Sequence, residues 1–195
     1  MKIIGLTGGI ASGKSTASAY LRELGAAIVD ADAISRASTR RGGAAFEAVC
    51  AAFGNILGAD GEIDRRKLGG IVFADEDARR KLNSIVHPAV MAESRAQIEN
   101  ARASGVKMCI LDVPLLFETG MEKLCDETWL IYVPREEQIR RMAERDGLDA
   151  AAAAARIASQ MPLEEKLKRA DVAIDSSGTI EQTREKLRCL WEERT

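Results

Sequence analysis

The sequence predicts an α/β fold in which helices cover a parallel five-stranded β-sheet. Five short runs of apolar and β-branched residues are separated by stretches with helical periodicity, a pattern typical of parallel strands joined by helical crossovers. The first run leads directly into a glycine-rich segment, and a helical stretch follows. The expected strands are residues 3–7, 27–29, 107–111, 128–133 and, with a weaker pattern, 172–174.

The glycine-rich segment has the pattern of a phosphate-binding loop (P-loop). Residues 8–15 read Gly-Gly-Ile-Ala-Ser-Gly-Lys-Ser, which fills every fixed position of G-x-x-x-x-G-K-[ST]. In such loops backbone N–H groups turn towards phosphate oxygens, the lysine reaches the β- and γ-phosphates, and the following hydroxyl ligates Mg²⁺. A glycine-rich turn formed by chance is the alternative. We therefore expect a three-layer fold of the P-loop nucleoside triphosphatase type, with the triphosphate bound by Gly8, Gly9, Ala11, Ser12, Gly13, Lys14, Ser15 and Thr16.

Composition and charge restrict the possible partners. The 195 residues include 28 Lys and Arg against 30 Asp and Glu, a net charge of −2, whereas a nucleic-acid binder dominated by phosphate contacts needs a basic excess. We therefore expect small-molecule substrates and no nucleic acid. No apolar run approaches the roughly 18 residues that span a bilayer, and no signal peptide precedes the first strand. The expected location is the cytoplasm, without a membrane partner.

The cysteines do not predict a metal site or a disulfide framework. Cys50, Cys109, Cys125 and Cys189 include no C-x-x-C pair, and His87 is the only histidine. A structural zinc site needs closely spaced Cys and His ligands. We expect reduced and mostly buried thiols.

The central part of the chain predicts a helical insertion. Residues 41–105 have helical periodicity and no convincing strand, so residues 1–40 and 106–195 are expected to form the core. A helical lid is expected over residues 135–160, because arginines recur there at helical spacing. We expect this lid to be mobile without ligand, since its arginines have little to pair with until phosphates arrive. These arginines are Arg135, Arg140, Arg141, Arg145 and Arg156.

Aspartates follow two of the expected strands. Asp30 and Asp32 end the second strand, which we expect beside the phosphate-binding loop, and Asp112 ends the third. Ligands of parallel sheets bind at the carboxyl ends of the strands. One carboxylate is therefore expected to bind a metal ion, and another is expected to accept a proton from an attacking hydroxyl. The alternative is that Asp30 or Asp112 merely caps a helix or turn.

The acceptor chemistry favours a kinase over a guanine-nucleotide switch. A switch needs an Asn-Lys-x-Asp motif, which the chain lacks, and its only Asp-x-x-Gly match, residues 175–178, comes after the last strand. Arginines on a closing helical pair suit phosphoryl transfer, because they stabilise developing charge and exclude water.

Several short segments in a fixed order, spread over the whole chain, form one pattern. They are residues 5–15, Asp30-Ala31-Asp32, His87-Pro88, residues 112–118 (Asp-Val-Pro-Leu-Leu-Phe-Glu), Arg145-Asp146, Gln160, Ala170-Asp171 and Ile174-Asp175. With these segments the chain resembles the dephospho-CoA kinases. The resemblance implies transfer of the ATP γ-phosphate to the ribose 3′-hydroxyl of dephospho-CoA, the final step of coenzyme A synthesis. It also implies a core, a helical CoA-binding domain and a lid.

The resemblance also implies residue roles. Asp32 would be the catalytic base, Lys14 and Ser15 would bind ATP and Mg²⁺, and Arg145, with Arg141, would act from the lid. Asp112 is the second candidate metal ligand. Leu115, Leu116 and Phe117 would line the acceptor pocket beside it. His87 matches a His-Pro element, and either contacts the substrate or begins a helix.

Two positions depart from the family pattern, and two other functions stay open. Ala11 stands where glycine is common, which a backbone outside the left-handed region tolerates. Ser176 and Ser177 replace frequent asparagines, which affects only adenine contacts. Another small-molecule kinase, acting on a nucleotide, gluconate or shikimate, would explain the loop and lid but not residues 112–118. A non-catalytic nucleotide-dependent module would have no use for Asp32. The expected assembly is a monomer or weak homo-oligomer.

Overall fold

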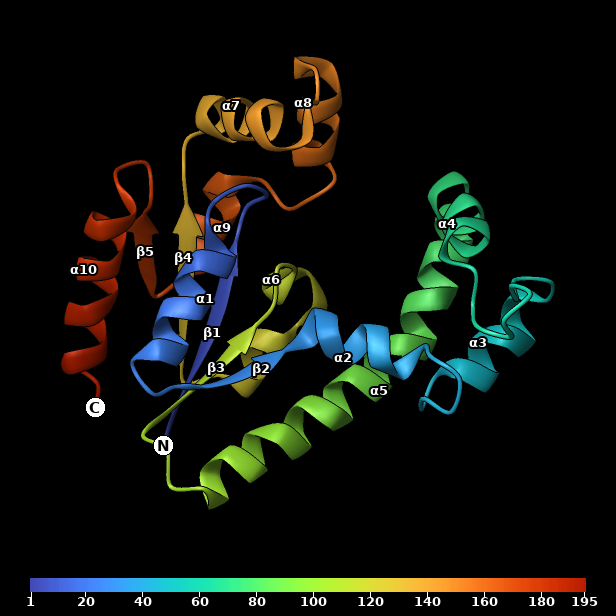
Figure 1. The fold of residues 1–195 in the computed structure, drawn as a ribbon, viewed down its shortest axis with the longest axis horizontal. Coiled ribbons are helices and arrows are strands. Elements are labelled where there is room, and N and C mark those ends of the chain that lie inside the picture. The colour runs from blue at the N-terminus through green and yellow to red at the C-terminus, as the bar shows by residue number, and fades with distance from the viewer. The chain divides into compact units, whose positions relative to one another are not determined.

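The computed structural model describes residues 1–195, and the chain divides into two units (Figure 1). The core unit comprises Met1–Val29 and Ile98–Thr195, and the helical unit comprises Asp30–Gln97. The insertion expected at residues 41–105 overlaps most of the helical unit. Helix α5, Glu76–Ala103, belongs to both units.

The sheet has five strands in the order β2-β3-β1-β4-β5. They are β1 (Lys2–Gly8), β2 (Ala27–Asp30), β3 (Met108–Asp112), β4 (Glu127–Tyr132) and β5 (Val172–Asp175). Strand β1 pairs in parallel with β3 and with β4, and β4 pairs in parallel with β5. The five-stranded parallel sheet is therefore confirmed. The expectation that β2 lies beside the strand of the loop is wrong, because β3 separates β2 from β1.

The sheet of the core unit is covered on both faces, which makes three layers. Side chains alternate along each strand, so Ile4 and Leu6 of β1 pack with Trp129 of β4 against helices α1 and α10. The opposite face of β1 contacts α6 and η1, and β4 contacts α9. The helices are α1 (Lys14–Glu23), α6 (Leu116–Thr119), η1 (Met121–Leu124), α9 (Leu163–Arg169) and α10 (Ile180–Glu192).

Two helices, α7 (Arg135–Asp146) and α8 (Ala150–Ala158), follow β4 and pack against each other (Figure 1). Helix α7 ends at Gly147, whose φ of +65° is the left-handed conformation that stops a helix. Helix α8 begins at Asp149, whose carboxylate accepts the amide of Ala152 at 2.7 Å. The segment expected to be a lid is therefore a capped helical pair.

The helical unit contains α2 (Ala31–Ser38), α3 (Phe46–Phe53), α4 (Arg65–Ala74) and most of α5. Asp30 caps α2, because its Oδ1 accepts the amide of Ala33 at 2.9 Å; the capping alternative is therefore confirmed for this aspartate. Pro88 lies inside α5, so the alternative that His87 begins a helix is wrong. No helix in the chain combines the length and apolar character that crossing a membrane requires.

Candidate active site

The phosphate-binding loop lies between β1, which ends at Gly8, and α1, which begins at Lys14. Gly13 precedes the helix with a φ of +85°, a conformation that glycine adopts without steric cost. Ala11 also has a positive φ, +58°. The expectation that Ala11 occupies an ordinary backbone position is therefore wrong, because an L-residue pays about 1–2 kcal/mol in this region.

A side chain at either of the first two glycines of the loop would displace its neighbours. A Cβ on Gly8 would lie 2.8 Å from the carbonyl oxygen of Ile131, and one on Gly9 would lie 2.5 Å from Nε2 of Gln138. The Ser12 hydroxyl is buried in the same loop and has no hydrogen-bond partner. A buried polar atom without a partner costs free energy. This hydroxyl is therefore a donor that a phosphate oxygen would satisfy.

Lys14 forms an ion pair with Asp112. The strand register explains this contact. Asp112 lies opposite Leu6 on the neighbouring parallel strand, so β3 ends at the same edge of the sheet as the loop. Both side chains are largely buried, with 18 % of Lys14 and 10 % of Asp112 exposed. The structure thus brings together the predicted phosphate-binding lysine and one of the two predicted catalytic-site carboxylates.

Two glutamines hold the apex of the loop from the side of the helical pair. Gln138 of α7 donates to the carbonyl oxygen of Ile10 at 2.7 Å, and the Ile10 amide donates to Oε1 of Gln160 at 3.2 Å. Sequence reasoning did not identify Gln138, because a glutamine in a polar helix looks like an ordinary surface residue. Its helical spacing from Arg141 is the only signal in the sequence.

Arg141 and Ser176 support the other side of the loop. Arg141 donates to Ser176 O at 2.7 Å and to Ala11 O at 3.5 Å. The buried Ser176 hydroxyl donates to Ser12 O at 2.6 Å. Ser176 therefore holds the loop backbone in place. The sequence predicts that this serine affects adenine contacts only, so this second role was not predicted. Ser177 donates instead to Asp175 at 2.6 Å and lowers the pKa of that carboxyl.

Four of the five arginines of the helical pair already have carboxylate partners, namely Arg140, Arg141, Arg145 and Arg156. The expectation that the arginines have little to pair with is therefore wrong for these four. Arg145 makes two 2.9 Å hydrogen bonds to the carboxylate of Asp146. Arg156 lies 3.5 Å from the same carboxylate. Glu137 binds both Arg140 and Arg141, and these arginines lower its pKa to about 2. A phosphate that binds Arg145 or Arg141 must therefore compete with these carboxylates or use the remaining N–H groups of the guanidinium.

The segment that follows Asp112 turns back against the core. Thr7 donates to Pro114 O at 3.0 Å, and Leu116 is fully buried against Gly5, where a Cβ would lie 2.8 Å from Leu116 Cδ2. Phe117 is also buried, whereas Leu115 is 39 % exposed. Of the three residues expected to line an acceptor pocket, Leu115 is the one whose side chain is accessible.

Asp32 and His87 belong to the helical unit. Asp32 lies in the first turn of α2, two residues after β2 ends at Asp30. His87 is half-buried in α5, and burial lowers its pKa, which favours the neutral imidazole.

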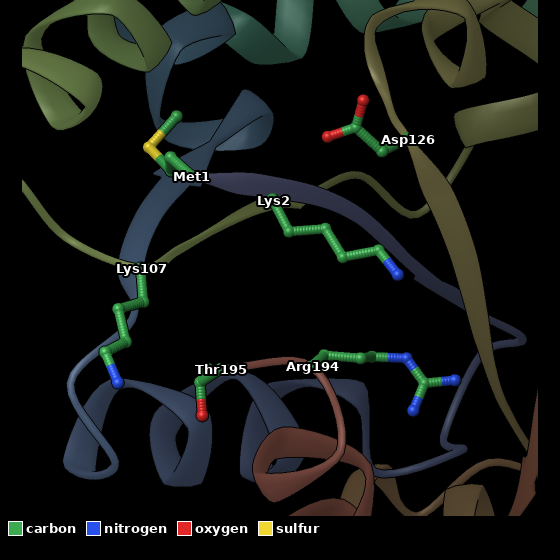
Figure 2. Close-up of a pocket in the computed structure, with 6 residues that line it drawn as sticks. All are labelled: Met1, Lys2, Lys107, Asp126, Arg194 and Thr195. Carbon is green, nitrogen blue, oxygen red and sulfur yellow. The ribbon is translucent and has the colours of Figure 1, made fainter.

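A hollow of about 500 Å³ opens at the opposite end of β1 from the loop (Figure 2). Lys2 and Arg194 lie across it from each other, and both pair with Glu127, at 2.6 and 2.7 Å. These pairs hold the pKa of Glu127 down to about 2. The hollow lacks a glycine loop, and ligands of parallel α/β sheets bind at the other edge. The candidate active site is therefore the P-loop edge.

Comparisons with known proteins agree with this site. The family model described as dephospho-CoA kinase matches residues 2–182. A dephospho-CoA kinase of Carboxydothermus hydrogenoformans is 54% identical over 188 residues, covering 96% of this chain and 91% of that protein.

Two solved structures are also similar to this chain over its whole length. The dephospho-CoA kinase from Campylobacter jejuni is 30% identical with a TM-score of 0.68, covering 100% of this chain and 97% of that one. A crystal structure from Thermus thermophilus is 36% identical with a TM-score of 0.84, and the match covers 100% and 98% of the two chains. The chain therefore belongs to the dephospho-CoA kinase family.

Proposed function

We propose that this chain is a dephospho-CoA kinase that transfers the γ-phosphate of ATP to the ribose 3′-hydroxyl of dephospho-CoA, giving CoA and ADP. The observation that carries the proposal is the Lys14–Asp112 ion pair, located at the loop of a chain that belongs to this family. Phosphoryl transfer needs positioning and charge stabilisation rather than protein covalent chemistry. The loop, the lysine and the carboxylate supply these functions.

The loop residues are proposed to hold the triphosphate. Backbone N–H groups at the end of the loop and the start of α1, from Gly13 to Thr16, and the unpartnered hydroxyl of Ser12 would donate to phosphate oxygens. Lys14 would leave Asp112 for the β- and γ-phosphates and stabilise negative charge on the transferring group. The acceptor hydroxyl needs alignment with the γ-phosphorus, and we assign this orientation, with acceptance of its proton, to Asp32.

The donor set fits Mg²⁺. This ion typically keeps several waters and takes one or two protein oxygens beside the phosphates, so it needs no larger cluster of protein ligands. Ser15, exposed in the first turn of α1, and Asp112 supply a hydroxyl and a carboxylate. When bound, Mg²⁺ would neutralise charge on the β- and γ-phosphates.

The remaining assignments concern the substrate side and the lid. Leu115 is the exposed candidate for contact with dephospho-CoA, with Leu116 and Phe117 packed behind it, and His87 is the candidate from the helical unit. Arg141 and Arg145 are assigned to the developing charge. We expect a cytoplasmic monomer or weak homo-oligomer without nucleic-acid or membrane partners. The net charge of −2 supports the absence of nucleic acid, and light scattering coupled to gel filtration tests the assembly.

The experiment is a product assay with MgATP. Dephospho-CoA, a nucleoside monophosphate, gluconate and shikimate are supplied separately, and CoA and ADP are quantified by chromatography. We expect CoA and ADP to form in equal amounts when dephospho-CoA is the acceptor, and no ADP to form with the other three acceptors. ATP binding without CoA formation would contradict the proposal. Turnover of another acceptor would identify a different small-molecule kinase, and binding without any turnover would identify a regulatory module.

A further inference from the structure

Lys166 is a buried lysine in the core unit. Its side chain is 1 % exposed, whereas Lys168 on the same helix, α9, is 69 % exposed and pairs with Glu165 at 2.7 Å. Burial of an ammonium group is costly unless the charge is paired and hydrogen-bonded. An apolar side chain of similar volume would fill the same space without that cost, so packing alone does not account for this charge.

The ammonium group of Lys166 bonds to the segment that contains Asp112. It donates to Pro114 O at 3.1 Å and pairs with Glu118 at 3.0 Å. The same carbonyl oxygen of Pro114 accepts the Thr7 hydroxyl at 3.0 Å. Pro114 lies only two residues after Asp112. Lys166 and Thr7 therefore fix the backbone that carries the Asp112 carboxylate to Lys14.

Glu118 extends this contact to the end of the helical pair. Its Oε1 accepts the amide of Met161 at 3.0 Å, and the preceding residue, Gln160, accepts the amide of Ile10 at 3.2 Å. A cavity of about 30 Å³ is lined by Gly9, Gln160, Met161 and Lys166, among others, so these groups converge behind the loop. The Lys166–Glu118 pair thus links three parts of the core unit: the segment after Asp112, residues 160–161 that follow α8, and the phosphate-binding loop.

We infer that Lys166 is a positioning residue for phosphoryl transfer. It does not contact the reacting atoms. It sets the position of Asp112 relative to Lys14. It also anchors the C-terminal end of the α7–α8 pair, which would be the hinge if this pair closes over the nucleotide. Loss of its charge should misplace Asp112 more than it changes the backbone donors of the loop, so turnover should fall while ATP binding persists.

The test is Lys166→Met, which keeps the length and apolar volume of the side chain. Far below the melting temperature, kcat for CoA formation should fall by about tenfold or more, with the ATP Kd within about threefold of the unchanged chain. Amide exchange of Met161 and of residues 113–118 should become faster. Lys168→Met is the matched control, and it should leave kcat, ATP binding and exchange unchanged.

The inference rests on the proposed kinase activity, and the two can fail separately. If the unchanged chain forms no CoA, the proposed function fails. If it forms CoA and the folded Lys166→Met variant has normal kcat, the positioning role is wrong. A variant that does not fold is replaced by Glu118→Gln, which keeps one oxygen able to accept from Lys166 and Met161 but removes the negative charge. Its kcat should be reduced with ATP binding retained, and normal turnover there would overturn the inference.

Discussion

Lys14 and Asp112 form an ion pair that joins the first residue of α1 to the last residue of β3. The two residues are far apart in the sequence, and parallel pairing of β1 with β3 brings them to one edge of the sheet. The pair holds the lysine at the loop before any nucleotide arrives. A triphosphate must therefore compete with Asp112 for the ammonium group, unless a cation takes over the carboxylate.

Lys14→Ala should remove most of the activity. The lysine supplies positive charge to the transferring phosphate, and loss of one preorganised donor typically lowers kcat by about 10²–10³-fold. Because the change leaves Asp112 without its partner, some loss of stability is also expected. The measurement is kcat for CoA formation together with circular dichroism of the variant. A near-normal rate in a folded variant would contradict the role assigned to Lys14.

Lys2→Ala is the matched control for Lys14. Lys2 also pairs with a carboxylate, Glu127, at 2.6 Å, but at the opposite end of β1. It should leave kcat unchanged, because no reacting group is expected there.

Asp32→Asn should lower kcat without weakening ATP binding. The substitution keeps an acceptor oxygen but removes the charge and the proton acceptor, and general-base contributions are typically about 10²–10⁴-fold. Asp30→Asn is the matched control, because Asp30 caps α2. Asparagine caps helices about as well as aspartate does, so this variant should retain its turnover.

Magnesium dependence separates the two roles open to Asp32. If Asp32 acts on the acceptor hydroxyl, the Asp32→Asn defect should persist at every Mg²⁺ concentration. Rescue of kcat by excess Mg²⁺ would instead assign Asp32 to metal binding, and Asp112 would then be the better candidate for the base.

The strands and the loop could be predicted because their signals are local. Strand β3 is buried along its whole length, and such strands read as continuous apolar runs. The expected range, 107–111, differs from Met108–Asp112 by one residue at each end. The phosphate-binding loop was equally evident, since its chemistry requires glycines and a lysine at fixed spacing.

The contacts that support the loop could not be predicted, because they are long-range. Gln138 is 128 residues from Ile10, and Ser176 is 164 residues from Ser12. Strand order is also a long-range property, which is why β2 was wrongly placed beside β1. The positive φ of Ala11 follows from the shape of the whole loop rather than from its own side chain.

Arg145→Ala should lower kcat by about 10²-fold while changing ATP affinity much less, the pattern of an interaction made mainly in the transition state. In the structure Arg145 is 61 % exposed and bonded to Asp146, so on closure a phosphate would compete with Asp146 or bind the remaining N–H groups of the guanidinium. Arg140→Ala is the control, because Arg140 is similarly exposed and bonds Glu137 and Glu144. Equal hydrogen exchange of residues 135–160 with and without a bisubstrate analogue would contradict a closing lid.

Ala11→Gly should stabilise the protein. Ala11 has a φ of +58°, a conformation that costs an L-residue about 1–2 kcal/mol, whereas glycine adopts it freely. The greater freedom of glycine in the unfolded chain offsets part of this gain. The free energy of unfolding in urea should therefore rise by up to about 1 kcal/mol. Ala155→Gly, in the exposed middle of α8, should instead lower it by about 1 kcal/mol. A loss of stability in Ala11→Gly would contradict the strain argument.

Glu127→Gln should change how stability depends on pH. Hydrogen bonds from Arg194, with smaller contributions from Lys2 and Trp129, lower the pKa of Glu127 from 4.5 to about 2. A carboxyl whose pKa is lower in the folded state stabilises the fold above its unfolded pKa and loses that contribution as the pH falls towards 2, on the order of 3 kcal/mol in total. Urea unfolding followed by the fluorescence of the two tryptophans should show that the unchanged chain is more stable than Glu127→Gln at about pH 4.5 and loses this difference as the pH falls towards 2. A difference in stability that stays constant across this range would exclude the linkage.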